Sequence, residues 1–296
     1  MSAQIPTRTR AYASPMTRSD VWERFVLRAG DVVITTPPRS GTTWTQAIVL
    51  GLIHGQPGMD TEIDRLSRWI DFALGDTNER LAALDAQTHR RCIKSHTPFD
   101  GITYQPKVHY IGVFRHPIDT HISQRGQMQN LQIKFEGGFT GEELLEESFP
   151  VFLEGNDTWG DEGVTLPGIV HHYLSLRRWA HLPNVHLMHY ADMKRDLRGA
   201  VGALAEAIEC HLDKELLDRI AESADFSAMK ANAVAAQAAR PSAVFKDFGK
   251  FFRTGTSNQW EGQLSDELVA AYRARLSSLL PEADSRWLEE GDALSG

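Results

Sequence analysis

Residues 31–46, DVVITTPPRSGTTWTQ, limit the fold of this chain more than any other segment. The apolar run 32–34 predicts a short buried strand, the prolines and glycine after it predict a tight loop, and apolar side chains then recur with helical spacing from Trp44. A strand that enters a helix through such a loop points several backbone N–H groups at one spot, at the positive end of the helix dipole. The segment therefore predicts a site for a phosphate-like anion, to which Arg39 adds a full positive charge.

The loop differs from the nucleotide-triphosphate P-loop, G-x-x-x-x-G-K-[ST]. Residues 38–44, PRSGTTW, have no first glycine at that spacing and no Gly-Lys pair. They resemble instead the 5′-phosphosulfate loop of the cytosolic-type sulfotransferases, usually P-K-S-G-T-T-W. That family transfers a sulfonate group from 3′-phosphoadenosine 5′-phosphosulfate (PAPS) to an acceptor and releases 3′-phosphoadenosine 5′-phosphate (PAP). The resemblance implies that the 5′-phosphosulfate is held by Arg39, which replaces the family's lysine, and by Ser40, Gly41, Thr42 and Thr43.

Apolar strands alternate with helical patterns along the rest of the chain. Three further strands are predicted, at 91–94, 108–114 and 185–190. Helices are expected near 117–128, 167–179, 197–208, 214–221, 265–280 and 283–289, whereas the Ala-rich stretch 231–239 fits either a helix or a loop. Nearly continuous apolar strands favour a parallel sheet covered on both faces. The expected fold class is α/β, a single P-loop-like domain over 1–296 with a central, mainly parallel sheet flanked by helices, a core at about 25–280 and a short polar N-terminal arm.

A second motif follows the strand at 91–94. Lys94-Ser95-His96 resembles the family's K-[TS]-H element, in which the histidine is the general base and the lysine contacts the sulfonate. A histidine with its ordinary pKa of about 6.5 can accept a proton at neutral pH. The resemblance therefore implies that His96, Lys94 and Arg39 are the catalytic residues.

Two more motifs resemble the family's 3′-phosphate ligands. Arg115 follows the strand at 108–114, and Ser123 lies eight residues later, which is the family's spacing. Arginine can bind a phosphate bidentately, although a strand-end salt bridge is an alternative role for Arg115. The sequence FFRTG at 251–255 resembles the family's R-K-G element, with Thr254 in place of the lysine, and implies three further ligands, Arg253, Thr254 and Gly255.

The resemblance also implies residues that surround the adenine, most of them aromatic and in the same order along the chain as in the family. The resemblance assigns this role to Trp44, Tyr190, Phe226 and Met229. It also implies that Trp69 and Phe72 line the acceptor pocket, and residues 131–165, rich in glycine and glutamate, fit a mobile gate. For each aromatic residue taken singly, packing in the core is the alternative.

Composition excludes several other classes. The net charge of −8 argues against a general nucleic-acid binder, and no apolar run approaches the roughly 18 residues of a membrane span. Cys92 and Cys210 form no metal or redox motif by their spacing, and a lone disulfide stays open. We expect a cytoplasmic enzyme that needs no metal.

The sequence thus predicts a PAPS-dependent sulfotransferase that uses in-line displacement. Its partner is a small-molecule acceptor with a hydroxyl group, an alcohol or a phenol, although a sugar hydroxyl or an amine also fits. A P-loop kinase and a non-catalytic nucleotide-binding member of the fold are the alternative functions. The oligomeric state stays open, because the family's dimer element K-x-x-F-T has no good match.

Overall fold

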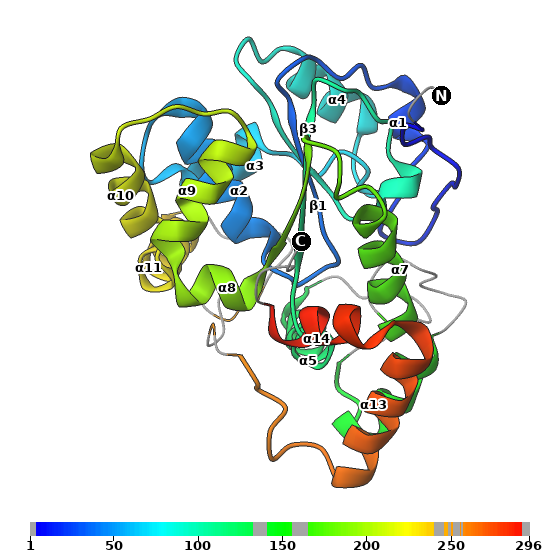
Figure 1. The fold of residues 1–296 in the computed structure, drawn as a ribbon. Coiled ribbons are helices and arrows are strands. Elements are labelled where there is room, and N and C mark those ends of the chain that lie inside the picture. The colour runs from blue at the N-terminus through cyan, green and yellow to red at the C-terminus, as the bar shows by residue number, and fades with distance from the viewer. Residues whose placement is uncertain are drawn as a thin grey trace.

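Four parallel strands form the centre of the protein. The computed structural model describes residues 4–132, 141–155, 165–239, 246–247, 250, 255 and 257–291. Its sheet has the strand order β2-β1-β3-β4, formed by β1 (Val32–Thr35), β2 (Cys92–Ser95), β3 (His109–Phe114) and β4 (Val185–His189). Helices flank this sheet, so the predicted α/β fold class is confirmed (Figure 1).

The two faces of the sheet are covered by different helices. Val32 and Ile34 face one hydrophobic cluster, whereas Val33 between them belongs to the other. The first cluster holds side chains of α2 (Thr42–His54), α9 (Leu197–Ala207) and α10 (Lys214–Ser223). The second holds side chains of α1 (Val21–Arg24), α6 (Leu145–Glu154), α7 (Leu166–Arg177), α13 (Asp266–Leu279) and α14 (Glu282–Glu290). The strands are apolar on both faces because each face of the sheet is covered by a layer of helices.

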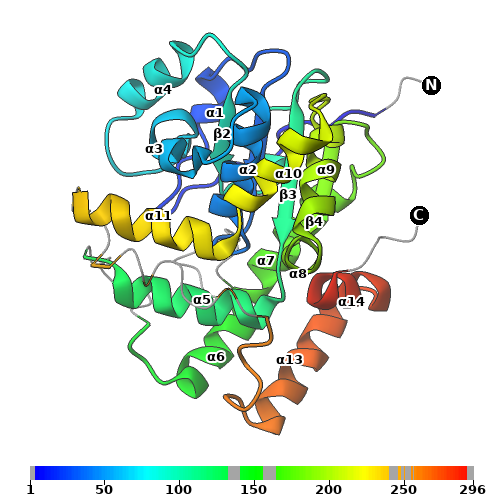
Figure 2. The same cartoon turned by 90° about the vertical axis from the view of Figure 1, so that its left-hand side faces the viewer.

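The remaining elements are short or lie at the ends of the sheet. They are η1 (Met59–Glu62), α3 (Ile63–Leu66), α4 (Thr77–Asp85), η2 (Phe99–Gly101), α5 (Pro117–Asn130), α8 (Tyr190–Arg195) and α11 (Phe226–Ala239). Figure 2 shows α5 beginning beyond the arrowhead of β3. The stretch 231–239, for which a helix or a loop was open, is the second half of α11.

Three sequence predictions need adjustment. The fourth strand ends at His189, and Tyr190 begins α8, because the His189 Nδ1 atom accepts the Ala191 N–H and caps that helix. The N-terminal arm is not merely polar, because Trp22 is buried in the core. At the other end Trp287 is buried in the same cluster, so the core also takes in residues on both sides of 25–280.

Three further expectations concern the two cysteines, the predicted gate and the absence of a membrane span. Cys92 and Cys210 are free thiols, so the lone disulfide is excluded. Of the segment 131–165 only 131–132, 141–155 and 165 are described, so about half of the gate predicted there lies outside the described residues. Where the chain is described, no helix is both long and apolar enough to cross a bilayer.

A buried histidine connects β3 to α5. His116 is the N-cap of α5, and its Nδ1 atom accepts the Ile118 N–H at 3.2 Å. Its ring lies near those of Trp260 and Tyr272, with centroids 5.5 and 5.8 Å away. Burial lowers the pKa of His116 to about 3. The native protein therefore holds this ring neutral in conditions where an exposed histidine is charged.

This ring should make the protein less stable in mild acid. The unfolded chain takes up the proton below its ordinary pKa of 6.5 and the native protein does not, so stability falls as the pH falls toward 3. Between about pH 6.5 and 5 this residue should cost about 1.5 kcal/mol of unfolding free energy. His116→Asn keeps a capping acceptor without the titration. Urea unfolding at both pH values should show a correspondingly shallower loss for this variant, and equal losses in both proteins would contradict the assignment.

Candidate active site

The loop between β1 and α2 has the geometry of an anion site. Arg39 and Gly41 have positive φ angles of 70° and 112°, and Gly41 is the N-cap of α2. A Cβ atom on Gly41 would lie 3.1 Å from the Tyr190 ring, so both the backbone conformation and the space favour glycine here. The Ser40 Oγ atom is buried and has no hydrogen-bond partner among the described residues. A buried hydroxyl with unused bonding capacity at the start of a 13-residue helix fits an anionic group.

Arg39 extends from this loop to α5. Its Nε atom donates to Ser123 Oγ at 3.1 Å, and its Nη1 atom donates to Gln127 Oε1 at 3.1 Å. Two residues that the sequence assigns to opposite ends of the nucleotide are therefore in direct contact. Gln127 is not among the residues predicted from the sequence, although its position one helical turn after Ser123 is a signal that could have identified it.

His96 is fixed beside the same loop. The residue follows β2 and is 6% exposed, and its Nδ1 atom donates to the Thr36 carbonyl at 2.7 Å. In the neutral ring this bond leaves the lone pair on Nε2. Burial lowers the pKa of His96 well below 6.5, and the positive charge of Lys94 lowers it further. His96 is therefore a neutral histidine with a basic Nε2 atom at neutral pH.

Trp69 contacts both residues of the Lys94–His96 pair. The Lys94 ammonium lies 4.6 Å from the centroid of the Trp69 ring, and the His96 ring meets that ring edge-on at 4.7 Å. Phe72 stacks on Trp69 with the ring centroids 4.5 Å apart. Burial lowers the pKa of Lys94 to about 8; Arg39 adds to this effect, and Asp64 and Asp71 oppose it. The structure thus places the two residues predicted for the acceptor wall next to Lys94 and His96, two of the three residues predicted for catalysis.

Arg115 lies close to Tyr190 and Trp44, two of the residues that were predicted to surround the adenine. Its guanidinium is 4.6 Å from the centroid of the Tyr190 ring, which meets Trp44 edge-on at 5.3 Å. The Tyr190 hydroxyl donates to the Gly255 carbonyl at 3.4 Å. The alternative role for Arg115 is present as well, because an Nη2 atom lies 3.6 Å from the Asp119 carboxylate. Arg115 therefore combines a strand-end ion pair with a place beside the predicted nucleotide residues.

Asp119 also lies at the site, although the sequence did not predict it there. Its side chain is buried and accepts the N–H groups of Asn258 and Gln259 at 2.9 and 2.8 Å. Burial raises the pKa of this carboxyl, although Arg115 and the two N–H groups act in the opposite direction. The side chain thereby ties the segment after residue 255 to α5.

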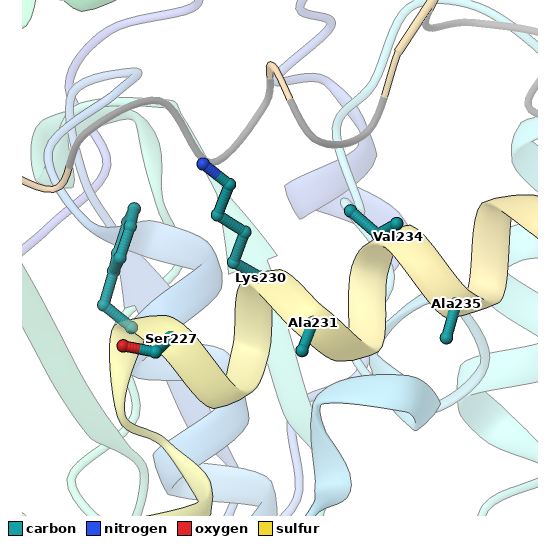
Figure 3. A pocket seen from close by; sticks show the side chains of 6 residues that line it. Ser227, Lys230, Ala231, Val234 and Ala235 are labelled. Carbon is teal, nitrogen blue, oxygen red and sulfur yellow. The ribbon is translucent and has the colours of Figure 1, made fainter.

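Of the other predicted nucleotide residues that the structure describes, Phe226 and Met229 lie on α11, and Gly255 lies against the Phe226 ring. Met229 is buried, and a Cβ atom on Gly255 would lie 2.8 Å from the Phe226 ring. The predicted ligands Arg253 and Thr254 lie outside the described residues. A groove of about 620 Å³ runs along α11, lined by Phe226, Ser227, Lys230, Ala231, Val234 and Ala235 (Figure 3). This groove is largely apolar, apart from Ser227 and Lys230.

The described side chains offer no alternative centre based on a metal. Among residues 4–132, 141–155, 165–239 and the described residues beyond them, no group of three or more His, Cys, Asp and Glu side chains is placed to hold an ion. The arrangement is instead a set of cations, hydroxyls and one neutral histidine at the carboxyl ends of β1, β2 and β3.

Comparison with known proteins decides the family. A family model described as Sulfotransferase domain matches residues 29–282. This chain belongs to the sulfotransferase family. The glycolipid sulfotransferase of Mycobacterium bovis (strain BCG / Pasteur 1173P2) is 30% identical to it over 98% of both chains. Sulfotransferase 2A2 of Mus musculus is 27% identical, over 86% of this chain and 85% of the mouse protein. The predicted family and enzyme class are therefore confirmed.

Solved structures of sulfotransferases share the fold. Mouse sulfotransferase SULT7A1 complexed with PAP superposes with a TM-score of 0.70 at 21% identity, covering 91% of each chain. Retinol dehydratase in a complex with retinol and PAP also gives a TM-score of 0.70, at 19% identity over 89% of this chain and 84% of that one. At these identities the likeness concerns the fold, and it agrees with the four-stranded parallel sheet.

Proposed function

We propose that this sulfotransferase uses PAPS as its donor and transfers the sulfonate group to a hydroxyl group of a small molecule, with His96 as the general base. One observation carries the proposal. The hydrogen bond from His96 Nδ1 to the Thr36 carbonyl holds a neutral base against the loop whose Ser40 hydroxyl has no partner in the part of the chain that the structure describes. A base and an anion site in such proximity suit the removal of a proton next to a bound anion.

The donor would lie across the carboxyl ends of β1 and β3. The loop residues 39–43 would hold its 5′-phosphosulfate, through backbone N–H groups, hydroxyls and the Arg39 guanidinium. Arg115 and Ser123, with Arg253, Thr254 and Gly255, would hold the 3′-phosphate. The adenine would lie among Trp44, Tyr190, Phe226 and Met229. The contacts of Arg115 and Trp44 with Tyr190 support this placement, because the Tyr190 ring connects a proposed ligand of the 3′-phosphate with a residue proposed to contact the adenine.

The reaction follows from these positions. The acceptor oxygen attacks the sulfur, a new S–O bond forms, and the bond from sulfur to the phosphate oxygen breaks, so that PAP leaves. The acceptor's proton passes to His96 Nε2. Lys94 and Arg39 would stabilise the negative charge that develops on the bridging oxygen, and preorganised positive charges are effective where water is excluded.

The surroundings of His96 favour an acceptor with an apolar part. Trp69 and Phe72 form a stacked aromatic wall next to His96 and Lys94. A relative that is 30% identical over nearly its full length is a glycolipid sulfotransferase, and a glycolipid combines hydroxyl groups with an apolar part. We therefore propose an alcohol or phenol attached to an apolar group.

A transfer assay with labelled PAPS and a panel of hydroxyl compounds tests the proposal. His96→Ala should lower turnover by about 10²-fold or more, because a general base typically contributes this much. Calorimetry should show PAP binding to this variant within about threefold of wild type, since His96 is not a proposed ligand of PAP. His181→Ala, an exposed histidine outside the site, is the control and should match wild type in both measurements.

Three results would contradict the proposal. His96→Ala with wild-type turnover would exclude the base assignment. Loss of PAP binding in that variant would move His96 into the nucleotide site. Mg²⁺-dependent binding of ATP that is tighter than binding of PAP would favour a kinase.

The pKa of Lys94 predicts how kcat/KM for PAPS changes with pH. The value of kcat/KM for PAPS reports ionisation of the free enzyme. Since the pKa of Lys94 is about 8, its charge is lost above that pH, and kcat/KM should fall by about tenfold per pH unit there. In Lys94→Arg the guanidinium stays charged, so this alkaline decline should disappear below about pH 10. Identical alkaline profiles in the two enzymes would assign the decline to another group.

A further inference from the structure

One buried carboxylate lies at the centre of the structure around His96. Asp71 is 1% exposed and follows Ile70, whose N–H donates to the Lys94 carbonyl at 3.0 Å. Four side chains donate hydrogen bonds to its two oxygens: Trp69, Trp22, Ser95 and Thr97. A buried carboxylate is costly unless its oxygens are hydrogen-bonded, and here the four donors supply those bonds.

Three of these four donors surround His96. Ser95 and Thr97 are its two neighbours in the chain, and the Thr97 hydroxyl donates to Asp71 Oδ2 at 2.7 Å. The indole N–H of Trp69, whose ring meets His96, donates to Asp71 Oδ1 at 2.6 Å. The residues on both sides of His96 and the aromatic ring against it are therefore bound to a single side chain.

The opposite side of the same turn is also fixed. The Thr35 hydroxyl donates to the Thr97 carbonyl at 2.6 Å. Because that hydroxyl has only one hydrogen, it accepts its other bond, at 2.9 Å, from the Nε2–H of the buried His172. The turn that carries His96 is thus held by β1 on one side and by Asp71 on the other.

We propose that Asp71 is a positioning residue of the transfer reaction. Its carboxylate sets the orientation of the Trp69 ring and fixes the turn that presents His96 to the acceptor. Asp71 itself touches neither donor nor acceptor. The proposal rests on the proposed role of His96 as the general base.

Asp71→Asn is the most informative substitution. Asparagine has the same shape but only one acceptor oxygen, whereas the carboxylate accepts all four bonds. The hydroxyls of Ser95 and Thr97 can rotate and accept a hydrogen bond from the new amide. The indole N–H groups of Trp69 and Trp22 are donors only, so at least one of them loses a good acceptor or competes for the remaining oxygen.

Trp22→Phe provides a matched control. Trp22 donates at 3.0 Å to Asp71 Oδ2, the oxygen that also accepts from Ser95 and Thr97. It comes from α1, and among the described residues its ring meets Phe25 rather than His96 or Lys94. Both substitutions weaken the same buried group of hydrogen bonds around residue 71. Asp71→Asn affects side chains that contact or flank His96, whereas Trp22→Phe does not. If Asp71 only stabilised the fold, the two variants should therefore have similar kinetics.

The experiment measures kcat, KM for PAPS, the affinity for PAP and the melting temperature of the two variants. Asp71→Asn should lower kcat by about 20-fold or more, with KM for PAPS and affinity for PAP within about threefold of wild type. Trp22→Phe should keep kcat within about twofold, whatever its melting temperature. A wild-type kcat in Asp71→Asn, or an equal loss of kcat in both variants, would overturn the proposal.

The alkaline limb of the kcat/KM profile gives a second readout. Asp71 and Asp64 raise the pKa of Lys94, whereas Arg39 and burial lower it, and His96 lies next to the same ammonium. Removing the charge of Asp71 should therefore move the alkaline decline to lower pH. Trp22→Phe keeps that charge and should leave the decline where it is in wild type; the same shift in both variants would contradict a direct effect of Asp71.

A second variant covers the case in which Asp71→Asn does not fold. Ser95→Ala combined with Thr97→Val leaves Asp71 with its two indole donors and removes both hydroxyls beside His96. This enzyme should bind PAP normally and lose at least about tenfold in kcat, and an unchanged kcat would overturn the proposal. Wild-type protein that transfers no sulfonate would refute the proposed function itself and the role of Asp71 with it, whereas unaffected variants of an active enzyme would refute only the role of Asp71.

Discussion

The hydrogen bond from His96 Nδ1 to the Thr36 carbonyl is the interaction on which the site depends. It joins the turn after β2 to the loop after β1, which are distant in sequence. The parallel pairing of Thr35 with Ser95 makes this bond possible, because both strands end at the same level. The bond also decides which nitrogen of His96 is basic. One backbone carbonyl thus sets the position of the proposed base and its tautomer together.

Electrostatics of the site contrast with those of the whole chain. The chain has a net charge of −8, yet Arg39, Lys94 and Arg115 converge at the carboxyl ends of three adjacent strands. Arg39 lowers the pKa of both Lys94 and His96, so the Arg39 and Lys94 cations are close enough to repel one another. An anionic ligand would relieve that repulsion. The arrangement therefore favours a ligand with several negative charges over a neutral one.

Much of this site could be predicted from the sequence, and the reason is topological. The strand, loop and helix over 31–46 have strong local signals, and the ends of parallel strands must meet at one edge of the sheet. The position of His96 next to Thr36 follows from that rule. The same rule says nothing about Asp71, because a single acidic residue in the run Trp69-Ile70-Asp71-Phe72 has no periodic signal.

Other features depended on contacts between distant segments. Gln127 bonds Arg39 across 88 residues of sequence, and Asp119 binds the N–H groups of Asn258 and Gln259 across about 140 residues. The N-terminal arm was expected to be short and polar, yet Trp22 is buried and donates to Asp71. Such tertiary hydrogen bonds are specified by how the surface of one element fits another, and local sequence patterns do not reveal them.

A crystal structure of the protein with bound PAP tests the central claim most directly, namely that the carboxyl ends of the parallel strands β1 and β3 form one nucleotide site. The account predicts a 5′-phosphate oxygen within about 3.2 Å of the Ser40 hydroxyl, and the 3′-phosphate in contact with Arg115 and Ser123. PAP bound away from the carboxyl ends of β1 and β3, or bound there with Ser40 Oγ still lacking a partner, would contradict it.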